Sequence, residues 1–270
     1  MMGFGLDIPT VATQRRAGPS GPAPFSPLDV SPTVFLDPSN LSSLYQDAGG
    51  GIPVSADGQP VGLVQDQSNN GIDLSQATSA ARPTYRTDGT LHWLETDGVD
   101  DTLVSAPVLD VANPVTMVIG YQMITATGSS RVNLAEISKS PTNGISAGIR
   151  PGIDRFQYYS RLSDEGVSAT NLAGTTWGGH TPHVITVLAT SGNIEARLDG
   201  NVVLNTSQNL TSQSVPNQPL RVGLGAVTAS IPGAFKLFGL QVWSAGSTQP
   251  TAFELAELES WMATKMGVST

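Results

Sequence analysis

Cysteine is absent from this sequence of 270 residues. Disulfide bonds, thiolate metal sites and a cysteine nucleophile are therefore excluded. Long apolar runs are missing as well, and none approaches the roughly 20 residues that a membrane-spanning helix needs. The N-terminal stretch contains no apolar run of signal-peptide length, so we expect neither a secretion signal nor a transmembrane segment.

Charge is scarce and mostly of one sign. Charged residues make up 13% of the chain, and the net charge is −9 at pH 7. Nucleic-acid grooves need clustered Lys and Arg, and anionic membranes attract basic segments, so we expect no nucleic-acid partner and no membrane partner. Glycine (29) and proline (19) are plentiful instead, which is typical of a turn-rich β protein.

The first 32 residues differ in composition from the rest. Six prolines between positions 9 and 32 interrupt any helix or central strand, and favour extended, polyproline-like backbone. This segment is either a disordered tail or an extended arm that becomes ordered on a partner particle. In the second case the attachment side chains are Phe4, Leu6, Ile8, Val11, Arg15, Arg16, Phe25 and Leu28.

From residue 33 onward, short β-type runs alternate with turn clusters. The runs are 34–37, 60–66, 91–95, 115–124, 132–137, 144–149, 156–159, 183–190, 194–200, 220–225 and 235–244. Runs of this length, separated by Gly, Asn, Asp and Ser, predict an all-β sandwich or jelly roll. Both faces of the run 235–244 are largely apolar, so we place that strand centrally.

One helix is predicted, at about residues 251–266. Thr251 as N-cap and Glu254 three residues later form a capping box, and Gly267 is typical of the residue after a helix. The apolar face consists of Leu255, Leu258, Trp261 and Met262. We expect this helix to pack on the outside or at one edge of the sandwich, within one domain spanning 33–270.

Three motifs match the sequences of known sites but lack the neighbouring residues or elements that those sites need. GISAG (144–148) matches the serine-hydrolase elbow, but no helix pattern follows Ser146, so we expect no nucleophile there. DQSNNG (66–71) resembles the start of an EF-hand loop, but Ala77 stands where a glutamate is needed, which favours a turn. His180 and His183 lack an obvious third metal ligand, which favours a loop and a strand start.

Paired carboxylates would indicate a glycosidase, because sandwich glycosidases need two of them about 5–9 Å apart on one face. Glu95 and Asp97 have strand spacing, but Asp97 begins an Asp-Gly turn. Glu136, Glu195 and Asp199 are otherwise single within their runs. The sequence offers no acid/base pair, and we predict no enzyme.

Aromatic side chains could bind sugars by stacking if they are exposed. The alternative for such side chains is packing in the core or between strands. The candidates for glycan binding are Tyr158, Tyr159, Arg161 and Trp177.

Several segments together resemble structural proteins of bacteriophages and phage-derived particles. The most specific are DPSNLSSLYQDAGGGIPVSADGQPVGLVQDQSNNG (37–71) and ATSAARPTYRTDGTLHWLETDGVDD (77–101). The hairpin IEARLDGNVVLN (194–205) and the closing strand with its helix (235–266) are similar too. On these motifs, residues 33–266 resemble the laminin G-like, concanavalin A-like jelly roll of that family.

The resemblance implies a virion component without catalytic activity, located in the particle as a head or tail decoration or spike. Capsid or tail proteins would be the partners of the arm, and a host surface polysaccharide is a further expected ligand. We also expect a homo-oligomer, because weak contacts gain from repetition. The alternative is a carbohydrate-active enzyme, a glycan hydrolase or lyase, on the same scaffold.

The segment HWLETDGVDDTLV (92–104) holds Asp97, Asp100 and Asp101 around Gly98. Asp-Gly recurs at 57–58, 88–89 and 199–200, which favours turns with a positive φ at the glycine. The three aspartates could instead share Ca²⁺, the one cofactor that remains open. The resembling proteins usually have an aromatic residue at the position of Thr96, so we expect Leu94 or Trp93 to supply its packing.

Overall fold

The structure is a computed structural model of the chain. It describes residues 24–111, 114–125, 131–140, 143–160, 166–168, 176–190, 192–207, 215–225 and 233–268; for some strand residues, Tyr159 among them, it describes the backbone alone. Several predicted site residues lie outside the described residues: Phe4, Leu6, Ile8, Val11, Arg15, Arg16 and Arg161.

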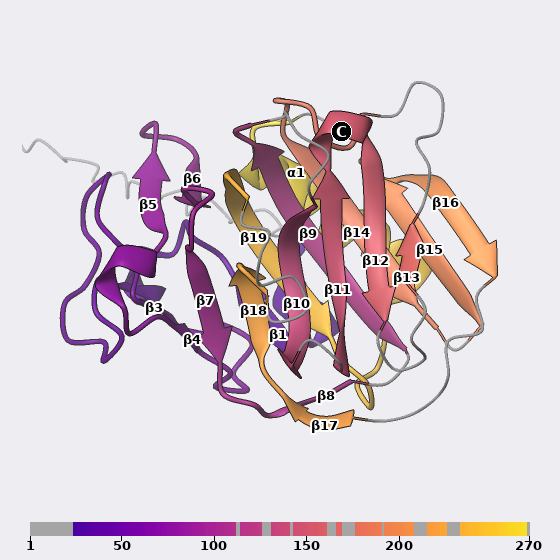
Figure 1. The fold of residues 1–270 in the computed structure, drawn as a ribbon, viewed down its shortest axis with the longest axis horizontal. Coiled ribbons are helices and arrows are strands. Elements are labelled where there is room, and N and C mark those ends of the chain that lie inside the picture. Colours follow the sequence, from indigo (N-terminus) through magenta and orange to yellow (C-terminus); the bar gives the residue numbers. More distant parts are fainter. Residues whose placement is uncertain are drawn as a thin grey trace, which may run out of the picture.

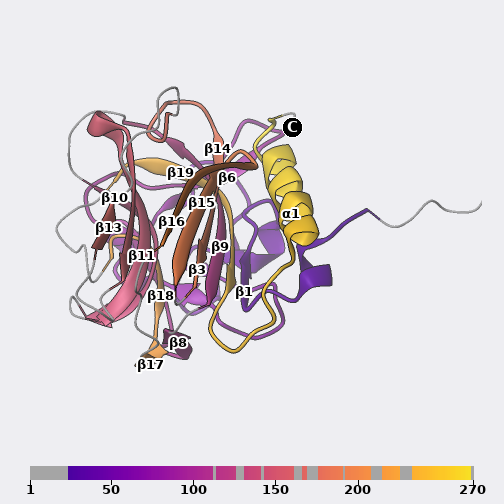
Figure 2. The ribbon, with the colours of Figure 1, turned by 90° about the vertical axis from the view of Figure 1, so that its right-hand side faces the viewer.

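Two antiparallel sheets pack face to face (Figures 1 and 2). The first sheet runs in the order β16 (Asn201–Ser207), β15 (Asn193–Leu198), β14 (His183–Ala189), β9 (Val115–Met123), β19 (Phe235–Trp243), β6 (His92–Glu95) and β5 (Thr84–Thr87), with β1 (Val34–Leu36) also paired to β19. We call it the helix-side sheet, because α1 (Ala252–Lys265) covers its outer face (Figure 2).

The second sheet, the open-side sheet, faces the viewer in Figure 1. Its order is β13 (Gly166–Ser168), β12 (Arg155–Ser160), β11 (Asn143–Arg150), β10 (Val132–Ser140), β18 (Leu220–Gly223), β7 (Thr102–Ser105), β4 (Leu74–Ser75), β3 (Leu63–Val64) and β2 (Leu44–Tyr45). The smaller elements are the strand pair β8 (Leu109–Val111) and β17 (Val215–Gln218), and the 3-10 turns η1 (Pro27–Val30), η2 (Leu41–Ser43), η3 (Ser79–Ala81) and η4 (Pro151–Ile153). The predicted all-β, jelly-roll-like sandwich with one C-terminal helix is confirmed.

Two hydrophobic cores hold these layers together. The larger one lies between the sheets and takes alternate residues of the long strands, such as Met117, Ile119 and Tyr121 of β9. The smaller one lies between the helix-side sheet and α1, where Val118 of β9 meets Leu258. Because β9 and β19 are buried on both faces, the predicted central position of 235–244 is confirmed.

Helix α1 begins and ends where the sequence predicted. The Thr251 hydroxyl accepts from the Glu254 amide at 3.3 Å, and the Glu254 carboxylate accepts from the Thr251 amide at 2.6 Å. Gly267 has φ +71°, as expected for the residue that ends a helix in the left-handed region. The capping hydrogen bonds hold the pKa of Glu254 below its usual value.

Two glycines form a shallow saddle under this helix. Gly120 of β9 and Gly239 of β19 are cross-strand partners. A Cβ on Gly120 would lie 2.5 Å from the Met262 sulfur, and a Cβ on Gly239 would lie 3.0 Å from its methyl carbon. Met262 is fully buried there. The absence of two side chains thus creates the space that the helix fills.

A register shift next to this saddle changes the facing of β19. The pairing with β9 shifts between Leu237 and Gly239. Phe235 and Leu237 face the inter-sheet core, but Leu240 and Val242 do so beyond the shift. Simple alternation along 235–244 would place Leu240 and Val242 on the opposite face from Phe235, and the register shift brings them to the same face.

The described part of the arm, residues 24–33, is fastened to the helix face, and we call it the arm root. Phe25 and Val30 pack against the core beneath α1, and the Trp243 indole donates to the Val30 carbonyl at 2.9 Å. Phe25 is partly buried against its own chain, and its predicted role in attachment stays a prediction. Leu28 remains 43% exposed, so its predicted role stays a prediction.

The DQSNNG loop fastens the arm root from the other side. The Asp66 carboxylate accepts from the backbone amides of Phe35, Ser68 and Ile72 at 2.9–3.0 Å. The Asn70 amide donates to the Pro32 carbonyl at 3.1 Å. Asp66 is therefore fully used by backbone donors, and the predicted turn rich in Asp and Asn interactions is confirmed.

Candidate functional site

The described residues place an imidazole–carboxylate pair at one end of the sandwich. His183 begins β14, and Asp199 follows β15 at the same end of the sheet. The Asp199 carboxylate accepts from the Val184 amide at 2.9 Å and lies 2.8 Å from His183 Nδ1. The other ring nitrogen, Nε2, lies 3.0 Å from the Thr181 hydroxyl. Two strands that are adjacent in the sheet thus position the two members of this pair, His183 from β14 and Asp199 from the end of β15.

This pair lines a cleft of about 600 Å³, which we call the His183 cleft. Leu198 and Val203 supply apolar surface, and hydroxyl, amide, imidazole and carboxylate groups supply the remainder. The lining residues are Thr176, Gly179, His180, Thr181, His183, Leu198, Asp199, Asn201 and Val203. A small apolar area with several convergent polar groups is typical of a small-ligand site.

The wall of the cleft, residues 176–181, is held by the hairpin loop at η4. The Asp154 carboxylate accepts from the Trp177 amide at 2.5 Å and from the Gly178 amide at 3.2 Å. A Cβ on Gly178 would lie 2.5 Å from the Pro151 Cα, so the two segments are in close contact. The cleft wall and the η4 hairpin therefore form one packed unit.

A larger hollow of about 690 Å³ lies at the opposite end of the strands. His183 is paired with Tyr121, whereas Ser244, which lines the larger hollow, follows the pairing of Trp243 with Thr116. Leu28, Pro32 and Thr33 of the arm root also line it. One end of the sandwich thus carries the His183 cleft, and the other end receives the arm root.

The outer face of the open-side sheet carries polar side chains that are buried. Arg131 donates to the Ser146 hydroxyl, which donates to Asn133 at 2.7 Å. Ser138 donates to Glu136, and all of these side chains are at most 1% exposed. Ser146 is therefore one member of a hydrogen-bonded row on this face.

Glu136 is the single carboxylate on strands β10, β11, β12 and β18. A glycosidase needs a second carboxylate about 5–9 Å away on the same face. These four strands therefore carry no pair of that kind, and the absence of enzymatic activity stays a prediction.

The predicted aromatic glycan site is wrong for two of its members. Tyr158 and Trp177 are each 1% exposed and belong to the core between the sheets. The Trp177 ring stacks on Phe156 at 5.3 Å between centroids, so neither of its faces is available to a sugar. Burial raises the pKa of the Tyr158 hydroxyl well above its usual value. Tyr159 is described in its backbone alone, and Arg161 lies outside the described residues.

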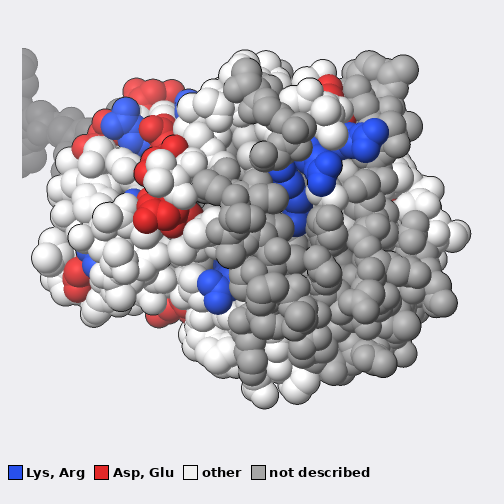
Figure 3. Space-filling view, viewed as in Figure 1, with Lys and Arg blue, Asp and Glu red and all other residues white. Residues whose placement is uncertain are grey.

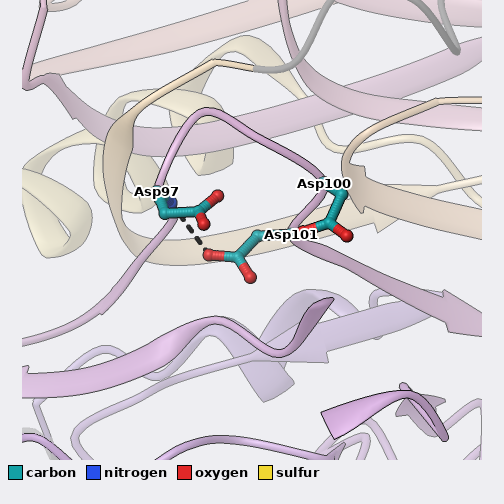
Figure 4. Close-up of side chains that lie close together, drawn as sticks. All are labelled: Asp97, Asp100 and Asp101. Atoms are coloured by element: carbon teal, nitrogen blue, oxygen red, sulfur yellow. Dashed lines mark hydrogen bonds between the residues drawn. The ribbon is translucent and has the colours of Figure 1, made fainter. Parts of the chain in front are cut away.

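The three aspartates of the 92–104 segment do come together (Figure 4). One ligand atom of each of Asp97, Asp100 and Asp101 lies within 4.8 Å of the others, and we call them the aspartate cluster. Within the described residues this is the one group of three side chains with metal-ligand spacing. The predicted juxtaposition is confirmed; whether it holds Ca²⁺ stays a prediction.

Backbone donors already use part of this cluster. The Asp97 amide donates to Asp101 at 2.8 Å, and the Val99 amide donates to Asp97 at 2.8 Å. Burial raises the pKa of Asp101 to about 6; the amide of Asp97 opposes that shift, and the negative charges of Asp97 and Asp100 add to it. The carboxylates thus serve as hydrogen-bond acceptors within a turn, and the turn buries Asp101 in a place that disfavours its charged form.

The Asp97-Gly98 turn joins the two sheets rather than two neighbours in one sheet. It connects β6 of the helix-side sheet to β7 of the open-side sheet, so these two strands follow each other in the chain but pair in different sheets. Gly98 has φ +78°, and the glycines of the other three Asp-Gly pairs also have positive φ, as predicted.

Thr96, next to this turn, fills its position by hydrogen bonding rather than by volume. Its hydroxyl donates to the Gly233 carbonyl at 2.6 Å and accepts from the Phe235 amide at 3.0 Å. Thr96 is 2% exposed, and both Leu94 and Trp93 are buried beside it in the chain. Thr96 therefore fixes the start of β19.

The sequence analysis missed the His183 cleft as a unit. It considered His183 only as a metal ligand and Asp199 only as a carboxylate without a partner. The 16-residue separation between them gives no local signal. The one usable clue was the Asp-Gly turn that ends the run 194–200. Such a turn implies a hairpin, and its loop residues lie near the end of the strand next to it in the sheet.

Comparison with known proteins supports the fold alone. No family model matches the sequence, and no curated protein is similar to it in sequence. The binding domain of botulinum neurotoxin serotype G has a TM-score of 0.60 at 9% identity, over 86% of this chain and 51% of that one. The receptor binding domain of botulinum neurotoxin D has a TM-score of 0.59 at 6% identity, over 87% and 53%.

A third similar structure is Trypanosoma rangeli sialidase, with a TM-score of 0.53 at 12% identity, over 88% of this chain and 33% of that one. The chain spans about half the length of the toxin domains it matches. At identities this low, structural similarity shows a shared β-rich architecture and nothing about function. The function has to be argued from the site.

Proposed function

We propose that this chain is a non-enzymatic component of a phage or phage-like particle that binds glycans on the host surface. The His183 cleft carries this proposal, because its hydroxyl, amide, imidazole and carboxylate groups surround the apolar surface of Leu198 and Val203 in a cleft of about 600 Å³. Solved structures of similar fold include toxin receptor-binding domains, which supports a binding role by analogy of fold.

The arm supports the particle part of the proposal. The arm root lies on the helix face, so an arm attached to capsid or tail proteins would leave the open-side sheet turned outward (Figure 2). The His183 cleft lies at the end of the strands away from the hollow that the arm root lines. The resemblance to phage structural proteins adds to this. Self-association on the particle would multiply weak sugar contacts.

The test of attachment must respect the fastened root. Deleting residues 1–23 removes only chain that precedes Phe25 and Val30, whereas deleting 1–32 would also strip apolar side chains from the core beneath α1. We expect the 1–23 deletion to fold with an unchanged melting temperature and to be missing from assembled particles. Normal incorporation of that deletion would remove the arm from the proposal.

The test of adhesion uses the same cleft. His180→Ala and Asn201→Ala shorten two exposed lining side chains and leave the His183–Asp199 side-chain contact in place, although Asn201→Ala also removes a 3.1 Å hydrogen bond from the Asn201 amide to the Asp199 carbonyl. We expect both to weaken binding of the full chain to a host polysaccharide on a glycan array. Asn205→Ala, on the same edge strand but outside the cleft lining, is the matched control. Binding that survives both cleft substitutions would show that sugars bind elsewhere.

One observation favours a second candidate, a carbohydrate-active enzyme. Asp199, His183 and Thr181 are in line at 2.8 Å and 3.0 Å, which is the order of orienting acid, base and hydroxyl in acyl-transferring enzymes. A glycan ester would be the substrate class. Release of acid from an acylated polysaccharide by the chain, lost in His183→Gln, would favour this candidate over pure adhesion.

A further inference from the structure

Two arginines stand side by side on the outer face of the open-side sheet. Arg150 at the end of β11 and Arg155 at the start of β12 are direct cross-strand partners. The preceding pair, Ile149 and Phe156, is buried between the sheets. Because facing alternates along strands, both arginines point outward, and both are half-buried.

No carboxylate neutralises this pair within the described residues. The ion pairs found there involve other arginines, histidine or lysine. Arg150 Nε donates to the Gln157 amide oxygen at 3.0 Å, which orients the guanidinium and leaves its terminal nitrogens for another acceptor. Like charges directly opposite each other destabilise a sheet, so an anion placed between them would relieve that repulsion.

A third guanidinium, from Arg131 next to the start of β10, lies over β11. A Cβ on Gly148 would be 2.6 Å from Arg131 Nε, so Arg131 crosses β11 one outward position away from Arg150. In a chain of net charge −9, basic side chains thus gather on this face, over the upper ends of β11 and β12, while acidic ones gather over β5 to β7 (Figure 3). The separation of charge gives the face an anion-attracting end.

The arginine pair is continuous with the His183 cleft. Arg150 and Arg155 flank η4, and the cleft wall at 176–178 packs on η4 through Asp154 and Pro151. The nearby Ile153 is 39% exposed and offers an apolar contact. A chain of sugars lying in the cleft would therefore extend over the arginine pair.

We propose that the glycan bound by this protein is acidic, and that Arg150 and Arg155 bind its carboxylate groups. This inference rests on the proposed glycan-binding function and adds the substrate class. Arginine suits the role because its planar fork matches a carboxylate. A sugar acid is favoured over nucleic acid, because a duplex carries about one phosphate charge per 1.7 Å and needs a longer cluster of Lys and Arg than two arginines on an acidic body provide.

The experiment measures binding of the full chain to carboxylated polysaccharides and to their carboxyl-reduced forms. The probes are polygalacturonate, hyaluronan and polysialic acid, with a duplex DNA oligonucleotide as the competing class. We expect at least one acidic polymer to bind more tightly than its reduced form. The double variant Arg150→Gln/Arg155→Gln should weaken that binding about tenfold and leave the reduced form unaffected.

Arg86→Gln is the matched control. Arg86 lies on β5, an edge strand of the helix-side sheet, whereas Arg150 and Arg155 lie on the open-side sheet. The inference is overturned if the arginine variants bind acidic polymers as wild type does, or if Arg86→Gln weakens binding equally. Tighter binding of DNA, lost in the same variants, would also overturn it. If only reduced polymers bind, and His180→Ala abolishes that binding, the proposed function stands and this inference fails; if no glycan binds, both fail.

Discussion

The saddle of Gly120 and Gly239 makes a sharp prediction about stability. Substituting Gly120 by Ala places a Cβ 2.5 Å from the sulfur and 2.8 Å from the Cγ of Met262, where neither strand nor helix has room. Overpacking of this kind costs about 1–3 kcal/mol. The gain from replacing a strand glycine offsets about 0.5–1 kcal/mol of it. We expect a net loss of about 0–2.5 kcal/mol in the free energy of unfolding.

The same substitution should lose its penalty when Met262 is shortened. Met262→Ala alone should cost about 2–5 kcal/mol, because the side chain is fully buried. In that background the new methyl group of Gly120→Ala enters vacated space and becomes neutral or stabilising. The double-mutant cycle should therefore give a coupling of about 2 kcal/mol in favour of the pair.

Urea unfolding of the four proteins of the cycle, followed by tryptophan fluorescence and circular dichroism, measures this coupling. In a melting experiment each kcal/mol corresponds to about 2–4 °C for a domain of this size. Gly192→Ala, where an added Cβ meets nothing within 4 Å, reports the backbone effect alone. Equal costs of Gly120→Ala in both backgrounds would refute the close packing of Met262 on the saddle.

Three further predictions concern charged side chains. The raised pKa of Asp101, about 6, means that the folded state holds its proton more tightly than the unfolded one, so stability should fall as pH rises from about 4 to 6; Asp101→Asn should flatten that fall in a pH series of melting temperatures. Because backbone amides already use the aspartate cluster, EDTA should leave the melting temperature unchanged, and a drop would establish a bound cation. Glu259 is nearly buried and pairs with Arg197 at 2.8 Å, so Glu259→Gln should cost about 2–4 kcal/mol by urea unfolding, whereas Glu257→Gln should cost little; equal effects would contradict a specific pair.

The parts of this fold that the sequence predicted are those fixed by near neighbours in the chain. The capping box at Thr251 and the positive φ of Gly98 depend on contacts within a few residues, and both are as predicted. The strand runs follow from the alternation of apolar residues, which reflects burial of one face. The DQSNNG turn is similarly local, since Asp66 binds amides of its own loop as well as one from β1.

The parts that the sequence did not predict depend on contacts between distant segments. Nothing near Gly239 in the chain signals the register shift, which follows from the packing of Met262 on the saddle. The passage of residues 97–101 from one sheet to the other depends on the strand order, which short patterns do not specify. The burial of Trp177 was missed for the same reason, because its loop is held by Asp154 from a different hairpin.

The fastening of the arm root decides how a pull on the N-terminus is carried by the protein. Tension along the arm meets the Trp243–Val30 bond and then β1, whose bonds to β19 lie across the direction of pull and share the force in shear. Because β19 lies in the interior of its sheet, the load enters the middle of the sandwich and not an edge that could peel. The Asp66 loop passes part of that load to the second sheet through β3 and β4. A pulling force on the arm is therefore shared by both sheets, and the two must be separated or unfolded together before the arm root comes free.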